Sequence, residues 1–453
     1  MNYKENLKVA FATVGCRFNQ FETAEMEELF RLRNFEIVPF SSDANIYVIN
    51  TCTVTKRSDY RCRQTIRRAI QNNRDAFVIV TGCYSQISPE EIGSIKGVDM
   101  VLGNTEKLSI VDHFEGLNIS DIKKMDMPKI VVRNMDRTRG FNAQRVKGFS
   151  GRTIAYLKVQ TGCNETCSFC IVAIARGAGI SEKPENILMQ ARELADAGFK
   201  EIVLTGVNLG SYGADLSPSR ELSDIVEMLT NIKGIERLRL SSINPTDINE
   251  RLIAVMKESV KVCRHLHIPL QSGDDEILKK MRRNYKSSFY RDLIMKLKDE
   301  IPGMGIGADV LIGFPGEDED KFKNTYRLIN ELPLSYLHVF TYSQREGTDA
   351  CGYDGQIPEY VKKERNSIIK ELGREKSNAF RQGFMGKVCR VLIENTRDKE
   401  TGLLKGYTDN YIPVILKACI ERSESGGDEL MNRLVDVRIA DISDNAVIGE
   451  LSG

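Results

Sequence analysis

The residues best suited to chemistry are three cysteines, Cys163, Cys167 and Cys170, in the run CNETCSFC. Three thiolates this close together indicate a common soft partner, and iron–sulfur clusters are held by such thiolates. A structural zinc site would require a fourth cysteine or histidine nearby, and none lies close in the sequence. Three ligands on a four-iron cluster leave one iron open to chelate the amino and carboxylate groups of a methionine-like ligand. We call these residues the clustered triad.

Three further cysteines are spread over the first hundred residues. Cys16, Cys52 and Cys83 directly follow the runs FATVG, YVINT and IVTG. The carboxyl ends of parallel strands share one edge of a sheet, so these thiols, the dispersed triad, are expected to meet there. The alternative is that buried cysteine acts as a small hydrophobe. We favour that alternative for Cys62, which lies in a basic helical stretch.

The elements that must position these cysteines alternate between strand and helix patterns. In the first domain, residues 1–118, strands are expected at 7–15, 45–50 and 76–82 and helices at 21–33 and 57–72. This βαβαβ order predicts an α/β fold with a doubly wound parallel sheet. The polar stretch 119–150, rich in Lys and Arg, is expected to be a basic linker.

A second strand–helix alternation fills residues 151–382. Its strands are expected at 154–160, 201–206, 237–243, 265–270, 306–313 and 335–342, and helical patterns follow the first five. Six such units predict a partial, open (β/α)6 TIM-like barrel, with the clustered triad after its first strand, where barrel enzymes build active sites. Short strands spaced by turns in residues 383–453 predict a small β-barrel.

Composition limits the function classes. The chain has 453 residues, 41% hydrophobic and 28% charged, which is typical of a soluble protein with two or three domains. It has no apolar run of the roughly 18 residues that cross a bilayer and no secretory pattern at its start, so we expect a cytoplasmic protein without a membrane partner. Eleven cysteines there favour metal ligation over disulfides. A net charge of +1 gives no sign of nucleic-acid binding.

Seven segments resemble, in order and spacing, the radical S-adenosylmethionine (SAM) methylthiotransferase family, and the resemblance covers nearly the whole chain. They are TVGCRFNQFETAEM, VINTCTVT, VTGCYSQ, QTGCNETCSFC, LTGVNLGSYG, HLHIPLQSGDDEILKKMRR and IGFPGE. The resemblance implies two 4Fe-4S clusters, an auxiliary one on the dispersed triad and a radical one on the clustered triad. It also implies that the C-terminal barrel is a TRAM-like RNA-binding domain.

The resemblance further implies a reaction. One SAM is cleaved reductively to methionine and a 5′-deoxyadenosyl radical, which abstracts hydrogen from an unactivated carbon. The auxiliary cluster supplies sulfur and a second SAM supplies the methyl group, so C–H becomes C–S–CH3. The implied partners are the anticodon stem-loop of tRNA, a low-potential electron donor and a sulfur donor.

The family has three branches, which act on isopentenyl-adenosine in tRNA, on threonylcarbamoyladenosine in tRNA, or on an aspartate of a ribosomal protein. The segments NQFET and TCTVTKRSDYRCRQTIRRA look most like the threonylcarbamoyladenosine branch, which predicts modification of the adenosine at tRNA position 37. A rival from another class is a non-catalytic iron–sulfur RNA-binding protein. The clustered triad argues against it, because a purely structural cluster gains nothing from a missing ligand.

Several residues are candidates for contacts with SAM. The resemblance puts Phe169 against the adenine, and other candidates lie at the predicted strand ends: Gly206, Asn208, Ser242, Asn244 and Gln271. Each of these polar residues could equally cap a loop. The chain departs from the family pattern at Thr161, where an acidic residue is frequent, and at Ala173-Ile174, where Pro-Tyr is common.

Basic residues and histidines have weaker assignments. We interpret Arg57, Arg61, Arg67 and Arg68 as RNA contacts, because their helix begins just beyond Cys52; the alternative is a solvated charged face. Arg176, just after the clustered triad, is a candidate for contact with the substrate. His265 and His267 alternate along one strand, which favours barrel-lining histidines over metal ligands.

Overall fold

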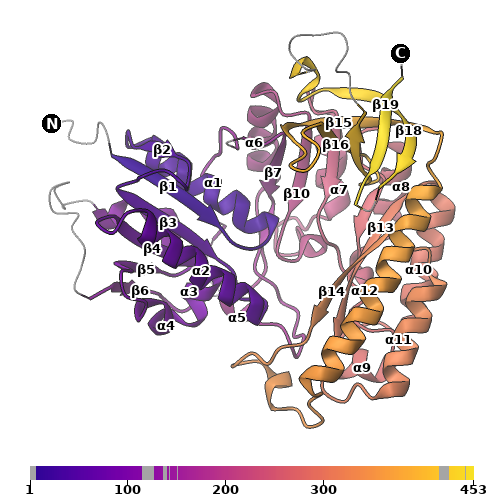
Figure 1. Ribbon diagram of the computed structural model, residues 1–453, viewed down its shortest axis with the longest axis horizontal. Coiled ribbons are helices and arrows are strands. Elements are labelled where there is room, and N and C mark those ends of the chain that lie inside the picture. The colour runs from indigo at the N-terminus through magenta and orange to yellow at the C-terminus, as the bar shows by residue number, and fades with distance from the viewer. Residues whose placement is uncertain are drawn as a thin grey trace.

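A computed structural model describes residues 7–114, 127–135, 140–141, 143–149, 151–417, 428–443 and 445–452. It has an N-terminal α/β unit, a central open barrel and a C-terminal β-barrel, in that order along the chain (Figure 1). The predicted α/β fold class is therefore confirmed. Parts of the expected linker, among them residues 119–126 and 136–139, lie outside the described residues.

The N-terminal unit is a parallel sheet of order β2-β1-β3-β4-β5-β6. Its strands are β1 (Lys8–Thr13), β2 (Glu36–Val38), β3 (Ile46–Thr51), β4 (Phe77–Gly82), β5 (Met100–Leu102) and β6 (Lys129–Val131). Every residue of β3 and β4 is buried, as expected for central strands covered on both faces. β6 comes from the stretch expected to be a linker, so part of that stretch completes the sheet.

Four helices of this unit matter for the site or the surface. They are α1 (Arg17–Arg31), α2 (Lys56–Asn72), α3 (Cys83–Ile87) and α4 (Pro89–Gly93). The side chain of Thr55 caps α2 by accepting from Ser58 N at 3.1 Å, which fixes where this basic helix begins.

The central unit is the expected six-stranded open barrel. Its strands are β7 (Ile154–Lys158), β10 (Glu201–Thr205), β11 (Arg237–Leu240), β12 (His265–His267), β13 (Gly305–Ile312) and β14 (Tyr336–Thr341). They form two parallel three-stranded sheets, joined by bridges from Leu238 to Val262 and from Ser242 to His267. β7 and β14 are the edge strands, so the barrel is open between them.

Helices surround this barrel (Figure 1). They are α6 (Pro184–Asp196), α7 (Leu222–Thr230), α8 (Glu250–Glu258), α9 (Asp275–Lys280), α10 (Ser287–Glu300), α11 (Glu319–Glu331) and α12 (Glu359–Gln382). A short antiparallel pair, β8 (Gln160–Thr161) and β9 (Ile180–Ser181), flanks the loop of the clustered triad, and α5 (Val172–Arg176) lies within that loop.

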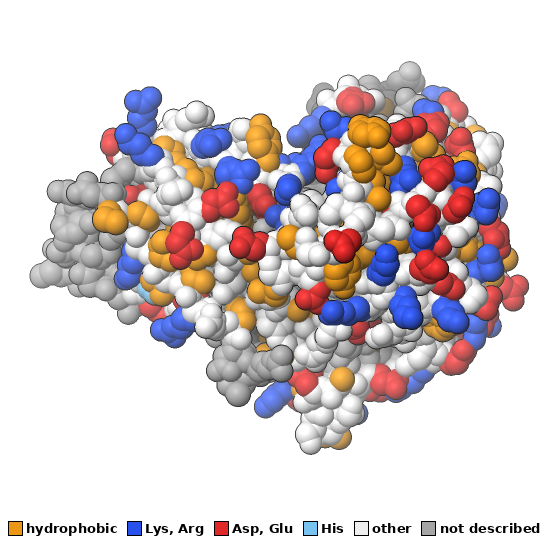
Figure 2. All heavy atoms as spheres, turned by 90° about the horizontal axis from the view of Figure 1, so that it is seen from below, with side chains coloured by type: hydrophobic (Ala, Val, Ile, Leu, Met, Phe, Trp, Pro, Cys, Tyr) orange, Lys and Arg blue, Asp and Glu red, His pale blue; other side chains and the backbone are white. Residues whose placement is uncertain are grey.

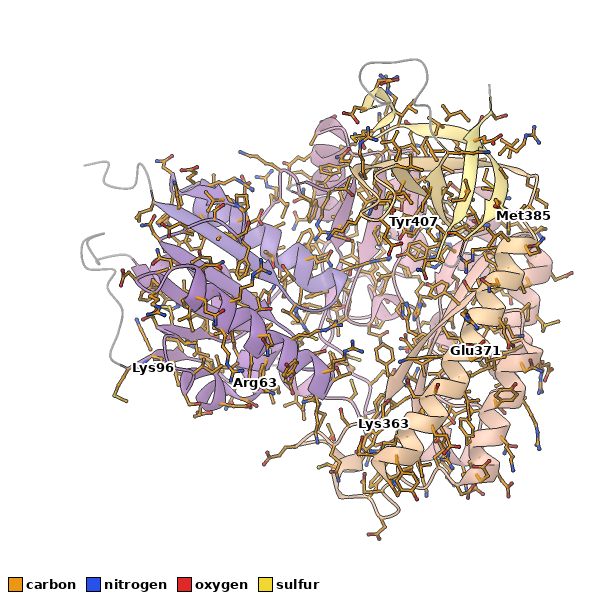
Figure 3. All side chains as sticks on the ribbon, in the orientation of Figure 1. Arg63, Lys96, Lys363, Glu371, Met385 and Tyr407 are labelled. Carbon is orange, nitrogen blue, oxygen red and sulfur yellow. The ribbon has the colours of Figure 1, made fainter. Side chains whose placement is uncertain are left out.

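The C-terminal unit is a closed five-stranded barrel, β15-β16-β17-β19-β18. Its strands are β15 (Val388–Arg397), β16 (Leu404–Thr408), β17 (Pro413–Leu416), β18 (Leu434–Ile442) and β19 (Val447–Leu451). It packs on the amino ends of the central strands: Arg237 donates to Tyr407 O at 2.9 Å and Asn410 to Gly303 O at 2.9 Å. Figure 3 labels Tyr407 at this junction.

The molecular surface has no single-sign face in the view from below, where acidic and basic side chains are interspersed (Figure 2). None of the helices within the described ranges is both long and apolar enough to span a membrane.

Candidate active site

The dispersed triad lies at one edge of the N-terminal sheet. Cys16 precedes α1, Cys52 follows β3, and Cys83 begins α3 directly after β4. Gly15, at φ +124°, brings the first two loops into contact, because a Cβ there would lie 2.7 Å from Cys52 Cβ. The strand-end prediction thus describes this edge correctly.

Burial and the neighbouring thiols keep Cys52 protonated without a metal partner. Burial, together with the neighbouring Cys83 and Cys16, raises the pKa of Cys52 to about 12. Cys62 instead exchanges hydrogen bonds with the backbone of Cys52, at 3.3 and 3.4 Å, which fits the structural role assigned to it.

The clustered triad lies in the loop between β8 and α5, and its three side chains are partly exposed. The loop starts from a tight approach: Gly162 has φ +71°, and a Cβ there would lie 1.8 Å from Ala178 O. Burial raises the pKa of Cys170 to about 12 and also raises that of Cys163. Their deprotonation therefore requires a positive partner, as a metal cluster supplies.

The sulfur spacing fits a cluster better than a single ion. Among the residues that the structure describes, one group of three His, Cys, Asp or Glu has all its ligand atoms within 4.8 Å of one another, and it contains no cysteine. Thiolates around one zinc ion, at Zn–S bonds of about 2.3 Å, lie only about 3.8 Å apart. Neither triad forms so compact a group, so their sulfur atoms lie farther apart than the ligands of one zinc ion.

One functional residue was missed from the sequence. Arg283, in the loop between α9 and α10, donates from Nη1 to Cys167 Sγ at 3.3 Å and from Nη2 to Asn244 Oδ1 at 2.8 Å. Asn244 in turn donates to Asn208 Oδ1 at 3.0 Å, and Asn208 N donates to Gln160 at 2.9 Å. This chain brings together two of the predicted SAM contacts and one cysteine of the clustered triad.

The remaining predicted SAM contacts surround the same barrel mouth less directly. Gly206 lies close to Gln160, whose Oε1 would be 3.0 Å from an added Cβ. Gln271 has φ +63° and its N donates to Asp309 O at 2.8 Å. Ser242 is exposed on the bridge to β12. The ring of Phe169 packs edge-on against Phe314 at 6.4 Å, so one face of the aromatic pair borders an apolar cluster.

Helix α5 joins the two triads. It begins two residues after Cys170 and packs against α3, which begins at Cys83. Asn104 ties the two sides, because its Nδ2 lies 2.7 Å from Ala175 O and 3.9 Å from Cys83 Sγ. The clustered and dispersed triads therefore lie on packed neighbours.

Arg176, at the end of α5, forms an ion pair with Glu22 of the N-terminal unit. It is buried and donates twice to Glu22, at 2.9 and 3.0 Å, and once to Asn19 Oδ1 at 2.6 Å. Burial would raise the pKa of Glu22, but Arg176 and Lys107 outweigh burial and lower it. A substrate could reach this guanidinium only by displacing Glu22, so the arrangement lends no support to the predicted substrate contact.

The basic helix α2 borders a cleft of about 590 Å³ between the N-terminal unit and the barrel. Arg57 and Arg61 line it from α2, and Phe340 and Lys370 line it from β14 and α12. Arg67 and Arg68 are exposed farther along the helix, and Arg68 lies over the ring of Phe40 at 5.8 Å. Arg63, labelled in Figure 3, is engaged with Tyr84 and Glu91.

Protein families match both parts of the chain that carry the cysteine triads, the central barrel and the N-terminal unit. Residues 157–329 match the radical SAM superfamily, and residues 8–103 match the uncharacterized protein family UPF0004. The chain is 40% identical to the threonylcarbamoyladenosine tRNA methylthiotransferase MtaB of Bacillus subtilis, over 95% of this chain and 93% of that protein. It is 33% identical to the tRNA-2-methylthio-N(6)-dimethylallyladenosine synthase of Alkaliphilus oremlandii, over 99% and 94%.

A solved structure supports the fold. The radical SAM methyltransferase TsrM from Kitasatospora setae, with tryptophan and a SAM analogue bound, aligns with a TM-score of 0.54 at 14% identity, covering 74% of this chain and 73% of that one. The same protein has also been solved with cobalamin and a [4Fe-4S] cluster bound.

Proposed function

The chain belongs to the family of radical SAM methylthiotransferases, and we propose that its substrate is tRNA, in which it converts the C2–H bond of N6-threonylcarbamoyladenosine at position 37 into C–S–CH3. One SAM takes up an electron and the C2 hydrogen atom and leaves as methionine and 5′-deoxyadenosine. A second SAM gives its methyl group to the sulfur and leaves as S-adenosylhomocysteine.

The observation that carries the proposal is the packing of α5 on α3, because it joins the two cysteine triads into one site. A 4Fe-4S cluster on the clustered triad would leave one iron open to SAM, and a second cluster on the dispersed triad would supply sulfur. A site that breaks a C–H bond and forms a C–S bond at the same carbon needs both the radical source and the sulfur source within reach of that carbon.

The chain's own residues would hold the SAM end of this site. Arg283 neutralises charge at Cys167 and fixes the amide of Asn244, which in turn fixes Asn208. These amides lie at the carboxyl ends of β10 and β11, the end of the barrel where ligands are bound in this architecture. We propose that they orient the methionine part of SAM.

The proposed tRNA contact is the cleft beside α2. Arg57 and Arg61 are exposed and lie with Lys370 around a space shared by the N-terminal unit and the barrel. Phosphates docked there would lie next to the sheet edge where Cys52 follows β3. The RNA-binding residues and the dispersed triad would therefore be adjacent. The C-terminal barrel is proposed as a second RNA contact.

Two findings favour the threonylcarbamoyl substrate over the isopentenyl one. Relatives that carry the threonylcarbamoyladenosine name, from Bacillus, Aquifex, Thermotoga and Rickettsia, are 37–40% identical to the chain. A further relative with the threonylcarbamoyladenosine name, from Chlamydia pneumoniae, is 31% identical, which is within the 30–33% of the relatives that carry the dimethylallyladenosine name. The segments around Cys16 and Cys52 resemble the same branch.

The test is to offer both hypomodified tRNAs to the reconstituted enzyme under reducing, anaerobic conditions and to analyse the nucleosides by mass spectrometry. The methylthio product should form on the threonylcarbamoyl tRNA and require the clustered triad. Product on the isopentenyl tRNA alone would refute the substrate and leave the reaction class intact, whereas no product on either tRNA would refute both.

A further inference from the structure

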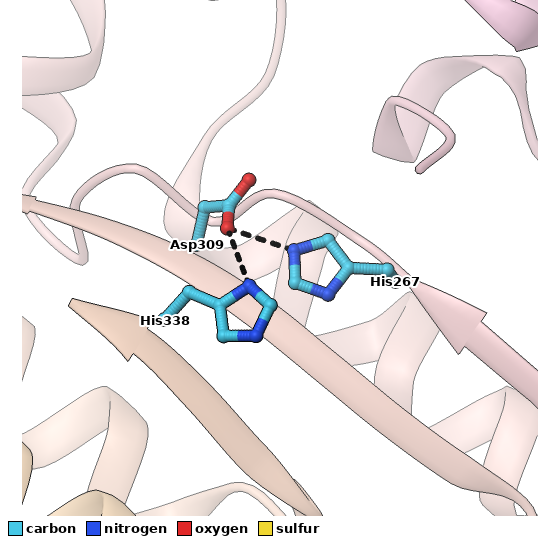
Figure 4. Close-up of side chains that lie close together, drawn as sticks. All are labelled: His267, Asp309 and His338. Carbon is cyan, nitrogen blue, oxygen red and sulfur yellow. Dashed lines mark hydrogen bonds and ion pairs between the residues drawn. The ribbon is translucent and has the colours of Figure 1, made fainter. Parts of the chain in front are cut away.

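Three polar side chains meet inside the barrel, one from each of three neighbouring strands (Figure 4). His267 Nε2 lies 2.8 Å from Asp309 Oδ1, and His338 Nδ1 lies 3.5 Å from the same oxygen. Their exposure increases along the series, from 11% for His267 and 23% for Asp309 to 57% for His338. His338 is therefore the accessible end of the group.

The accessible end faces the barrel lumen. Leu337 packs outward on α12, because its Cβ would lie 3.2 Å from a Cβ added at Gly373. Successive side chains of a strand point to opposite faces, so Tyr336, His338 and Phe340 point inward. The open side of His338 thus faces the lumen, the space that a base modified at the carboxyl-end mouth of this barrel would enter.

Behind Asp309 the hydrogen bonds form a chain. The hydroxyl of Tyr336 lies 3.1 Å from His267 Nδ1 and 2.9 Å from His265 Nε2, and His265 Nδ1 is buried without a partner among the residues that the structure describes. A buried unpaired N–H is costlier than a buried lone pair. The cheaper arrangement leaves the lone pair on His265 Nδ1, so His265 Nε2 donates to Tyr336, Tyr336 to His267, and His267 to Asp309.

The direction of these hydrogen bonds distinguishes a metal site from a metal-free, hydrogen-bonded arrangement of His267, Asp309 and His338. A metal ion on His267 Nε2, Asp309 and His338 would require the proton of His267 on Nδ1, and would reverse the chain so that His265 Nδ1 became an unpaired buried N–H. Without a metal, Asp309 is an anion whose Oδ1 lies 2.8 Å from His267 Nε2 and 3.5 Å from His338 Nδ1. Burial would raise the pKa of Asp309, but His267 and His338 lower it.

We propose that His338 is a specificity residue, which donates from Nε2 to the carboxylate-bearing N6 side group of the substrate while its Nδ1–H donates to Asp309. Both ring nitrogens carry a proton in that complex, so an imidazolium lies between two carboxylates. This inference rests on the proposed function and names the group that reads its substrate. Arg176 is closed to that role by Glu22, whereas His338 is more than half exposed and supported from behind. An apolar N6 group would leave the His338 N–H without a partner, which disfavours it.

The test compares His338→Gln and His338→Phe with the unaltered full chain, each with both clusters reconstituted. A charge-assisted hydrogen bond lost at a half-exposed site should raise KM for the threonylcarbamoyl tRNA about tenfold or more in His338→Phe. His338→Gln, which keeps a donor, should lose less. Formation of 5′-deoxyadenosine from SAM without tRNA should stay unchanged in both, because this donor does not act on SAM. His113→Gln, in the N-terminal unit, is the matched control.

The outcomes separate this inference from the proposed function. If the unaltered enzyme prefers the threonylcarbamoyl tRNA and His338→Phe keeps both that preference and its KM, the proposed function stands and the role of His338 is refuted. If elemental analysis finds a metal beyond the cluster iron that is lost in His338→Gln, the three side chains are metal ligands and the donor role is overturned.

Discussion

Replacing Arg283 should lower the reduction potential of the cluster on the clustered triad. Its Nη1 lies 3.3 Å from Cys167 Sγ, a distance at which two unit charges interact by ~5 kcal/mol at an effective dielectric constant of ~20. For a one-electron couple that energy corresponds to roughly 220 mV, which is an upper bound. The added electron is shared by irons and sulfurs farther from the guanidinium, so we expect about a third of this, ~70 mV.

Two substitutions separate charge from shape. Arg283→Gln removes the charge and should shift the potential by about that amount to more negative values. Arg283→Lys keeps the charge, but one ammonium cannot reach both Cys167 and Asn244, which the two guanidinium nitrogens contact at 3.3 and 2.8 Å. The lysine variant should therefore nearly keep the potential and still bind SAM more weakly.

The assay is an anaerobic redox titration followed by electron paramagnetic resonance. It is done in a background where the dispersed triad is changed to alanine, so that one cluster gives the signal. Equal potentials, within about 20 mV, for the glutamine variant and the parent would show that the 3.3 Å contact does not act on the cluster.

Three further predictions use other parts of the molecule. Changing the clustered triad to alanine should leave about half of the reconstituted iron, as two separate four-iron sites require; all or none remaining would refute the two-site assignment. Neutralising Arg57 and Arg61 should weaken tRNA binding and reduce its log–log salt slope by about 1.5, whereas the matched pair Lys323→Gln and Arg327→Gln on α11 should not. Burial raises the pKa of Glu317 from 4.5 to about 7, so the contribution of this carboxyl to stability should be fully present below pH ~4.5 and be lost as pH rises through 7. Thermal melts of Glu317→Gln should show a flatter pH dependence, and an unchanged profile would contradict the shift.

The C-terminal barrel is hydrogen-bonded to the central unit, so point substitutions test RNA contact more directly than a truncation does. Arg239 is buried and donates to Thr408 O at 3.1 Å and to Asp409 O at 2.8 Å. Deleting residues 386–453 would leave this guanidinium without those acceptors and uncover the amino ends of the strands. Loss of RNA binding by such a truncation would then report on stability as well as on contact.

The sequence predicted the long strands and the cysteines at their ends, because buried parallel strands are continuous apolar runs and each cysteine of the dispersed triad follows one directly. Strands as short as β2, β5 and β6, with three residues each, carry no period to detect. β16 is hard to detect for another reason, since its Gly406 gives no strand signal although a Cβ there would lie 2.2 Å from Leu392 O.

The polar partnerships of the site could not be predicted from spacing. Arg283 and Cys167 are 116 residues apart, and Arg176 and Glu22 are 154 apart. Each pair is joined only when the barrel closes or the N-terminal unit docks. His338 is a similar case, since its neighbours come from β12 and β13 and the sequence showed only the alternation of His265 and His267.

The buried charges between the two triads are better explained by positioning than by stability. Glu22 with Arg176 and Lys107, and Glu25 with Lys158, lie at ion-pair distances of 2.6–2.9 Å with side chains at most 7% exposed. Desolvation offsets most of the attraction in such pairs, so they add little to the free energy of folding. They do admit one docking of α1 against the barrel, because any other would leave a buried charge unpaired. That single docking holds Cys16 and Cys83 at a fixed separation from α5, and a C–S bond formed at the carbon that loses its hydrogen requires such a fixed separation.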